Sequence, residues 1–319
     1  MPKLLITGAG GQLGQELTAL RGQYPEWSFY TPNRQELDIA DEQAVADYFA
    51  AVKPDYCLNT AAYTAVDRAE EEQALAFAIN AKAARFLAEC CAEHQTHLLH
   101  FSTDYVYQGG IARPLLEDDP TEPAGVYAAS KLRGDEAVLQ VLPTATVIRT
   151  SWVYSSFGHN FVKTMLRLGE ERERLGIVFD QIGTPTYAKD LAQASLQLIA
   201  LLEAEPDKRA ELAGIFHYSN EGVCSWYDFA LAIFEMTGIE CDVRPIESHE
   251  YPTPAQRPHF SVLNKGKFKK HTGLEIRHWR EALRECLQQL SGRRHTVYGG
   301  IVLIAPDGTV KTRMVETAV

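Results

Sequence analysis

Hydrophobic and polar positions follow two alternating rhythms along the first 150 residues. Short runs of leucine and β-branched residues are separated by longer stretches in which apolar residues recur every three or four positions. The expected strands are residues 3–7, 27–31, 55–60, 97–102 and 144–150, and the expected helices are 12–20, 41–51, 72–93 and 126–141. Strands that alternate with helices indicate βαβ units. The pattern therefore predicts an α/β protein with a Rossmann-type, doubly wound parallel sheet.

The rhythm loosens after residue 150. Helices are still expected at 160–173 and 187–203, strands at 177–180 and 215–219, and a closing helix at 278–290. The stretch from Tyr251 to Pro258 contains three prolines, so it cannot form a regular element. We therefore predict a Rossmann domain made of residues 1–151 and about 186–221. A smaller, discontinuous domain would consist of about 152–185 and 222–292.

The last segment, residues 293–319, does not fit either domain. It contains two β-prone runs, 297–305 and 309–315, joined by Pro306-Asp307-Gly308, which is typical of a hairpin turn. A β-hairpin and a loosely held tail are both compatible with this pattern.

Composition narrows the classes of function. The chain has 319 residues, 45% of them hydrophobic, and a formal charge of −11. An acidic chain lacks the positive field expected of a protein that binds nucleic acid or an anionic membrane. No apolar run approaches a membrane span or a secretory signal. The six cysteines show no metal-ligand spacing, so we expect a cytoplasmic protein with free thiols.

A glycine-rich turn follows the first expected strand. Gly8, Gly11 and Gly14 lie between that strand and the first helix. In a dinucleotide fold this position needs a tight turn, close approach of the backbone to the pyrophosphate, and the amide groups at a helix N-terminus. We therefore expect a nicotinamide dinucleotide here, although a tight turn without a ligand has the same appearance.

The end of the second expected strand bears on the choice of dinucleotide. An acid that binds the adenosine ribose is usual at this point, but here Asn33 and Arg34 occupy it. A neutral amide followed by a guanidinium would accept a 2′-phosphate, which favours NADPH over NADH. Arg34 on a solvated loop is the alternative.

Two segments carry acid–base chemistry. Tyr127 and Lys131 are spaced i, i+4 at the start of a helix, which puts the phenol and the ammonium on one face. A nearby ammonium can lower the pKa of a phenol, which can then exchange a proton with a carbonyl oxygen during hydride transfer. Thr103 and Asp104 follow the fourth strand, where they can bind the reacting oxygen and a sugar hydroxyl. Taken alone, the first pair occurs by chance on many helices, and the second is also compatible with a local turn.

Taken together, these segments resemble the extended short-chain dehydrogenase/reductases that act on nucleotide sugars, and within them the family that reduces dTDP-4-dehydrorhamnose. The resemblance covers roughly residues 1–291. It is carried by Gly8-Ala-Gly-Gly-Gln-Leu-Gly14, Ala61-Ala-Tyr-Thr-Ala-Val-Asp67, Ser102-Thr-Asp-Tyr-Val-Tyr107, Tyr127-Ala-Ala-Ser-Lys131, Arg149-Thr-Ser-Trp-Val-Tyr154, Asn160-Phe161, Asp180-Gln-Ile-Gly-Thr-Pro-Thr186, Arg257-Pro258 and Ser261-Val-Leu263.

The resemblance implies hydride transfer from NADPH or NADH to C4 of dTDP-4-dehydro-β-L-rhamnose, giving dTDP-β-L-rhamnose. Tyr127 would protonate the C4 oxygen, Lys131 would lower its pKa and hold the nicotinamide ribose, and Thr103 would tune it. The cofactor would be bound by Gly8, Gly11, Gln12, Leu13, Gly14, Asn33, Arg34, Asp38, Ile39, Ala62, Tyr63, Thr64, Tyr127 and Lys131. The substrate would be bound by Thr103, Asp104, Trp152, Asn160 and Arg257.

Some of these residues have simpler explanations. A lone tryptophan such as Trp152 is more often a core residue, and Arg257 could be a surface arginine in a proline-rich loop. If it is not, its guanidinium would supply the local positive site for a diphosphate. The resemblance also implies that the protein could form a homodimer and use Mg²⁺, but the sequence identifies no metal site, and Lys189 lies where an acid might be expected.

Two other functions remain open from the sequence. One is a related nucleotide-sugar epimerase or 4,6-dehydratase, although dehydration commonly needs a second acid after Asp104, and Tyr105 stands there. The other is a non-catalytic regulatory subunit that binds NADP(H) on the same fold, for which the C-terminal extension would contact a partner.

Overall fold

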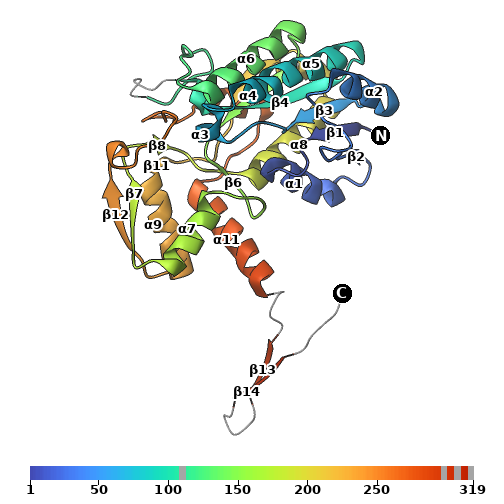
Figure 1. Ribbon diagram of the computed structural model, residues 1–319. Coiled ribbons are helices and arrows are strands. Elements are labelled where there is room, and N and C mark those ends of the chain that lie inside the picture. The colour runs from blue at the N-terminus through green and yellow to red at the C-terminus, as the bar shows by residue number, and fades with distance from the viewer. Residues whose placement is uncertain (108–112, 296–299, 305–309, 315–319) are drawn as a thin grey trace.

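The structure, a computed structural model, describes residues 1–107, 113–295, 300–304 and 310–314, with side chains described as far as residue 292. Figure 1 shows their arrangement. The strands are β1 (Lys3–Thr7), β2 (Ser28–Tyr30), β3 (Tyr56–Asn59), β4 (His97–Thr103), β5 (Thr146–Thr150), β6 (Val153–Tyr154), β7 (Arg174–Val178), β8 (Ile182–Gly183), β9 (Thr186–Tyr187), β10 (Gly214–His217), β11 (Cys224–Ser225), β12 (Asp242–Ile246), β13 (Gly300–Ile304) and β14 (Val310–Met314). The helices are α1 (Gln12–Ala19), α2 (Glu42–Val52), α3 (Val66–Ala69), α4 (Gln73–Phe77), α5 (Ala83–Glu93), α6 (Val126–Val141), α7 (Phe161–Glu171), α8 (Ala188–Ala204), α9 (Trp226–Thr237), α10 (Gly266–Thr272) and α11 (Trp279–His295).

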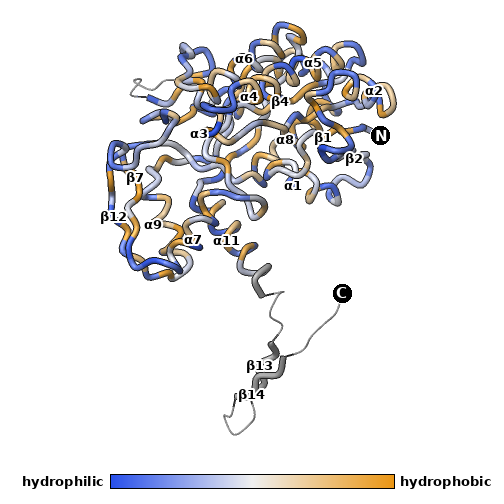
Figure 2. Tube along the Cα trace, viewed as in Figure 1, coloured by the Kyte–Doolittle hydropathy of each residue, from blue (hydrophilic) through white to orange (hydrophobic). Residues whose placement is uncertain are grey.

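The centre of the fold is a six-stranded sheet in the order β10-β5-β4-β3-β1-β2, and every neighbouring pair in it is parallel. Both faces are covered, as parallel sheets require. Leu4 and Ile6 pack on the side of α1 and α8, whereas Leu5 packs on the side of α2, α5 and α6. Along these helices, hydrophobic positions alternate with hydrophilic ones (Figure 2). The predicted α/β Rossmann-type fold is thus confirmed.

A second hydrophobic cluster lies apart from the sheet. It gathers buried residues of α7, α9 and α11 with those of short strands, and Phe229, Ile233, Leu283 and Cys286 have no exposed surface. The short strands are paired away from the main sheet: β12 with β7, β11 with β8, and β6 with β9. This cluster contains residues from 154–175, 187, 224–243 and 279–287, so several separate stretches of the chain meet in it.

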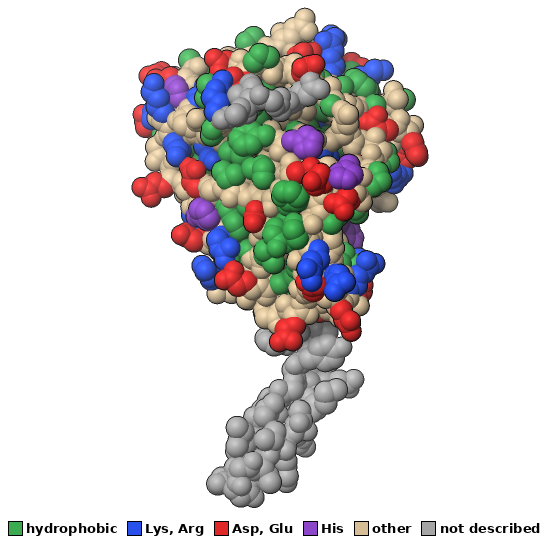
Figure 3. All heavy atoms as spheres, turned by 90° about the vertical axis from the view of Figure 1, so that its left-hand side faces the viewer, with side chains coloured by type: hydrophobic (Ala, Val, Ile, Leu, Met, Phe, Trp, Pro, Cys, Tyr) green, Lys and Arg blue, Asp and Glu red, His purple; other side chains and the backbone are tan. Residues whose placement is uncertain are grey.

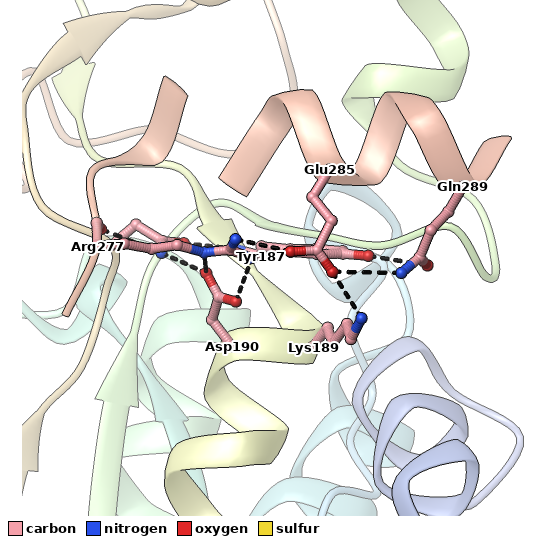
Figure 4. A network of polar contacts seen from close by, with 7 residues as sticks. Tyr187, Lys189, Asp190, Arg277, Glu285 and Gln289 are labelled. Atoms are coloured by element: carbon pink, nitrogen blue, oxygen red, sulfur yellow. Dashed lines mark hydrogen bonds and ion pairs between the residues drawn. The ribbon is translucent and has the colours of Figure 1, made fainter. Parts of the chain in front are cut away.

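A polar network ties α11 to the start of α8 (Figure 4). Arg277 bridges Asp190 and Glu285, with Nη2 at 2.6 Å from Asp190 Oδ1 and Nη1 at 2.6 Å from Glu285 Oε2. Lys189 Nζ lies 2.6 Å from the other oxygen of Glu285. Tyr187 donates to Gln289 Oε1 at 3.0 Å. The network holds the second cluster against a helix of the sheet.

The prediction of a single long helix at 72–93 is wrong in detail, because this segment is divided. It consists of α4, a π-helical turn at Ala78–Lys82, and α5. The wider turn directs Asn80 towards the loop after β3, where its side chain accepts from Tyr63 N at 2.8 Å and donates to Ser130 Oγ at 2.9 Å. The π turn and these Asn80 contacts occur together, and a periodicity of 3.6 residues does not reveal such a turn.

Two further observations concern the chain's end and surface. β13 and β14 pair antiparallel, while the predicted turn Pro306-Asp307-Gly308 lies outside the described residues. On the face in Figure 3, Lys and Arg side chains lie among Asp and Glu, with hydrophobic side chains between them. Within the described part of the chain, the helices are too short or too polar to cross a membrane.

Candidate active site

A cavity of about 890 Å³ opens where the order of the sheet reverses, between β1 and β3. Ligands of open α/β sheets bind at this point, beyond the carboxyl ends of the strands. Fifteen of the predicted site residues line the cavity. They are Gly8, Gly11, Gln12, Leu13, Asn33, Arg34, Asp38, Ile39, Ala62, Thr64, Thr103, Asp104, Tyr127, Lys131 and Trp152.

The glycine turn has the shape that a pyrophosphate needs. Gly8 has a φ of 68°, and a Cβ there would lie 2.6 Å from the backbone of Ala61. The amide of Gly11 closes the turn by donating to the carbonyl of Gly8 at 2.9 Å. Helix α1 then begins without a side-chain cap. Its first amide groups are therefore available to an anion in the cavity, which the helix dipole also favours.

Tyr127 and Lys131 reach the cavity from the first turns of α6. Lys131 is 2% exposed, and its Nζ donates to the carbonyl of Phe101 at 2.7 Å. Burial raises the pKa of Tyr127 to about 12, and the neighbouring Thr103 hydroxyl opposes this shift. Burial also lowers the pKa of Lys131 to about 8. Lys131 is not among the groups that shift the pKa of Tyr127 in this arrangement, in which its ammonium donates to a main-chain oxygen of β4.

Thr103 and Asp104 stand at the end of β4. Thr103 Oγ1 donates to Asp104 Oδ1 at 3.1 Å and accepts from Tyr105 N at 3.2 Å. Asp104 is 1% exposed, and its Oδ2 has no hydrogen-bond partner. Burial raises the pKa of Asp104 to about 7, and the nearby hydroxyls of Ser261 and Thr103 oppose the shift. The carboxyl group therefore has an unused oxygen in a buried site that borders the cavity, as a residue that binds a sugar hydroxyl would.

Trp152 forms an aromatic wall with a residue that the sequence did not reveal. Its indole stacks on that of Trp226, with ring centroids 3.6 Å apart and an angle of 8° between the planes. Both rings line the cavity. Trp152 has a φ of 47°, which is rare for a bulky side chain. A Cβ at Gly183 would lie 2.7 Å from the Trp152 ring, so a glycine makes room for this placement.

The loop after β2 borders the other end of the cavity. Asn33 Oδ1 caps the turn by accepting from Gln35 N at 2.8 Å. Arg34 and Asp38 form an ion pair at 3.6 Å, and the Arg34 side chain is 73% exposed. The guanidinium is therefore free enough to turn towards a phosphate at the cavity mouth.

Four predicted residues are not among those that line the cavity, and the structure places each in a contact of its own. Gly14 packs beneath the turn, where a Cβ would lie 2.5 Å from Gly8 O. Tyr63 donates its hydroxyl proton to Glu72 Oε2 at 2.6 Å. Asn160 caps α7 and donates to Gln12 Oε1 at 2.9 Å.

Arg257 is the fourth predicted residue that does not line the cavity. Its guanidinium is bidentate to Asp67, with Nη2 at 2.8 Å from Oδ2 and Nη1 at 3.2 Å from Oδ1. Asp67 also accepts from Ala255 N at 3.2 Å. These contacts attach the proline-rich loop to α3, beside the cavity rather than in its wall.

Two further residues escaped the sequence interpretation. Asp135 lies buried one helical turn beyond Lys131 and pairs with Arg149, the distance from Arg149 Nε to Asp135 Oδ2 being 3.0 Å. Asp135 follows Lys131 by the same i, i+4 interval by which Lys131 follows Tyr127. This spacing could have identified Asp135 from the sequence. For Trp226 the sequence contained no comparable spacing. It indicated only that a helix starts at Ser225, where the structure has a capping box.

The described residues contain no group of three or more His, Cys, Asp or Glu side chains that could hold a metal ion. Asp190 and Glu285, the acids nearest to Lys189 in the network of Figure 4, are paired with Arg277, and Glu285 also with Lys189. In this structure both carboxylates are therefore engaged by cationic side chains.

Comparison with known proteins agrees with this geometry. Residues 2–291 match the RmlD substrate binding domain. The spore coat polysaccharide biosynthesis protein SpsK of Bacillus subtilis is 42% identical over 91% of this chain and 99% of its own. The dTDP-4-dehydrorhamnose reductase of Aggregatibacter actinomycetemcomitans is 39% identical over 89% and 98%. The structure of dTDP-4-dehydrorhamnose reductase from Bacillus anthracis in complex with NADP has a TM-score of 0.84 and 36% identity over 91% and 100%. The match spans nearly the whole length of these relatives, and the chain belongs to the RmlD substrate binding domain family.

Proposed function

We propose that the protein is a reductase that transfers hydride from NADPH or NADH to C4 of dTDP-4-dehydro-β-L-rhamnose, giving dTDP-β-L-rhamnose. One observation carries the proposal. Thr103, Tyr127 and Lys131 meet the glycine turn in a single cavity, in a chain that is 39% identical to a protein named dTDP-4-dehydrorhamnose reductase. A proton donor and a dinucleotide turn around one cavity are what reduction of a carbonyl needs.

The residues of the turn fit a nicotinamide dinucleotide, which supplies the hydride when bound. The backbone of the turn at Gly8 and Gly11 and the uncapped start of α1 would hold the pyrophosphate. Arg34 would pair with a 2′-phosphate, which favours NADPH. A relative's structure in complex with NADP supports this assignment.

Tyr127 would protonate the C4 oxygen. Its raised pKa keeps the phenol protonated at neutral pH, which suits a proton donor in the direction of reduction. Thr103 would bind the same oxygen, and the buried Lys131 would hold the nicotinamide ribose and place a positive charge beside the phenolate as the proton leaves. No further acid is required for this step.

The remaining assignments concern the substrate. Asp104 would accept from a hydroxyl of the deoxysugar, and Trp152 would contact its ring. Arg257 would bind the diphosphate, and for this it must exchange its bidentate partner Asp67 for a phosphate. Asn160 would contribute indirectly, because its side chain holds that of Gln12 in the cavity wall. The place of Asp104 and Trp152 in the cavity lining supports the first two of these roles.

The domain division is proposed on the same grounds. Residues 1–151 with about 186–221 would form the cofactor domain, because they supply the six-stranded sheet and α8. Residues 152–185 with 222–292 would form the substrate domain around the second cluster. Residues 293–319 would be an extension to both. We further propose that the protein has no nucleic-acid or membrane partner, in keeping with the acidic composition. A cytoplasmic location is proposed from the free cysteines, and a homodimer from the resemblance alone.

The test is direct. Purified protein is mixed with NADPH or NADH and a panel of dTDP- and GDP-linked 4-keto-6-deoxysugars, and loss of nicotinamide absorbance is followed. We expect turnover of dTDP-4-dehydro-β-L-rhamnose, and none with authentic substrate would refute the proposal. Tyr127→Phe should lose about 10²- to 10⁴-fold in kcat while still binding NADPH, and full activity in this variant would remove the proposed acid.

A further inference from the structure

Behind the active site, three charged side chains share one buried space. Lys131 and Asp135 lie one turn apart on the same side of α6, and each is no more than 2% exposed. Arg149, from β5, is also 2% exposed, and its Nε lies 3.0 Å from Asp135 Oδ2. Arg149 and Asp135 therefore form a buried ion pair, and Lys131 is buried one helical turn away from it.

Lys131 has a weaker partner than Arg149. The acceptor of its ammonium is the neutral carbonyl of Phe101, at 2.7 Å. Arg149 donates to Asp135 and also to Tyr107 Oη, at 2.7 Å. A buried ammonium needs a compensating negative charge, because burial otherwise favours its neutral form. The carboxylate that can supply this charge to Lys131 is the one already held by Arg149.

Within the part of the chain that the structure describes, Asp135 is the one carboxylate whose charge favours the protonated form of Lys131. On the sheet side, His100 of β4 has Nε2 at 3.7 Å from Asp135 Oδ1, and burial holds the pKa of His100 well below its usual value, so it is neutral. Asp135 Oδ1 and His100 Nε2 make no hydrogen bond. The other titratable groups that act on these side chains are Tyr127 on the same helix, Tyr107 after β4, and Asp104, whose charge acts on Tyr127.

We infer that Asp135 is a positioning residue for the reaction, the counterion that keeps Lys131 protonated while Arg149 competes for the same carboxylate. The inference rests on the proposed reductase function, since it concerns the lysine that this function uses. Asp135 touches neither cofactor nor substrate in this role. It acts through the charge of Lys131.

The directions of the pKa shifts of Lys131 and Asp135 agree with this role. Burial lowers the pKa of Lys131 to about 8, and the charge of Asp135 opposes that shift. Burial raises the pKa of Asp135, and Arg149 and Lys131 oppose this in turn. Lys131 thus loses its proton just above neutral pH. Loss of the charge of Asp135 would lower this pKa further, to a pH at which the activity is measured.

Asp135→Asn tests the inference while preserving shape and an oxygen acceptor for Arg149. Wild-type activity, measured as kcat/KM with NADPH and dTDP-4-dehydro-β-L-rhamnose, should fall as the pH rises through about 8. In the variant this fall should begin at least about one pH unit lower, a roughly tenfold loss at a fixed pH on the slope. A uniform loss at every pH, with the slope unmoved, would show a merely structural role and overturn the inference.

Two more variants sharpen the result. Glu136→Gln is the matched control, because Glu136 is the next residue of α6 but is exposed and pairs with Arg133. It should leave the profile unchanged. Arg149→Gln should move the fall to higher pH, because Asp135 would then serve Lys131 alone. A shift in the same direction as in Asp135→Asn would contradict the competition, and this variant remains informative if Asp135→Asn does not fold.

A second readout separates the inference from the proposed function. The protein is labelled with ¹³C at lysine Cε, the Lys131 signal is assigned by its absence in Lys131→Met, and its titration is followed by NMR without cofactor or substrate. Asp135→Asn should lower the midpoint by at least about one unit, and an unchanged midpoint would overturn the inference. An inactive wild-type protein would refute the reductase proposal alone.

Discussion

Asp104→Asn should make the stability of the protein less dependent on pH. The carboxyl group of Asp104 is 1% exposed, and burial raises its pKa from 3.8 to about 7. The folded protein therefore binds this proton more tightly than the unfolded chain does. Stability contributed by the protonated group is complete at low pH and is lost as the pH rises through about 7, because folding must then either keep the proton or bury a charge.

The size of the effect follows from the shift. A difference of about three units corresponds to about 4 kcal/mol of free energy of unfolding as an upper limit. About 3 kcal/mol of this should appear between about pH 5 and pH 8, since part of the loss occurs at lower pH. The buried His97 and His217 act in the opposite sense, because burial lowers their pKa to about 4 and about 3, and their contribution is common to wild type and variant.

The assay is urea denaturation of both proteins at about pH 5 and pH 8. The wild type should lose up to about 3 kcal/mol more than Asp104→Asn between these conditions. Asp118→Asn, which removes an exposed carboxyl group from the loop after β4, controls for net charge and should behave as the wild type. Parallel pH dependences of wild type and Asp104→Asn would show that Asp104 is not the buried, proton-binding group described here.

Three further predictions concern single contacts. Arg34→Ala should raise KM for NADPH by about tenfold relative to KM for NADH, measured by steady-state kinetics, and equal changes for both would rule out the 2′-phosphate contact. Gly134→Ala should destabilise the protein by about 1–3 kcal/mol or more, seen in denaturant titrations, because the new Cβ would collide with the carbonyl of Asn80. Trp226→Ala should cost about 3 kcal/mol of stability and raise KM for the nucleotide sugar more than it lowers kcat, because Trp152 loses its stacking partner. Trp226→Phe should restore much of that KM, and a KM unchanged in Trp226→Ala would contradict the aromatic wall.

Local patterns predicted the sheet well. The run at Lys3–Thr7 coincides with β1, and the end of the expected helix at Val141 coincides with that of α6. Such elements depend on periodicity and on breakers that a single segment carries. The glycine turn and the Tyr127–Lys131 spacing are local in the same sense, which is why most of the residues assigned from them line one cavity.

Contacts between distant segments were not predictable in this way. The pairing of Arg257 with Asp67 joins residues 190 positions apart, and no spacing in the sequence announces it. The stack of Trp152 on Trp226 depends on the backbone φ of one residue and the missing side chain of Gly183. The short strands β6, β8, β9 and β11 have two residues each, too few to show a period.

The π-helical turn at Ala78–Lys82 also fixes how α4 and α5 are rotated relative to each other about the helix axis. An α-helix rotates by about 100° per residue, so the extra residue in a π turn puts α4 and α5 out of phase with each other. Deleting one residue there would restore a regular helix at the cost of rotating everything that follows. Asn80 would then no longer meet Tyr63, and α5 would present a different stripe to α6. The length of this segment is therefore as constrained as its composition, although Ile79 is its one residue that lines the cavity.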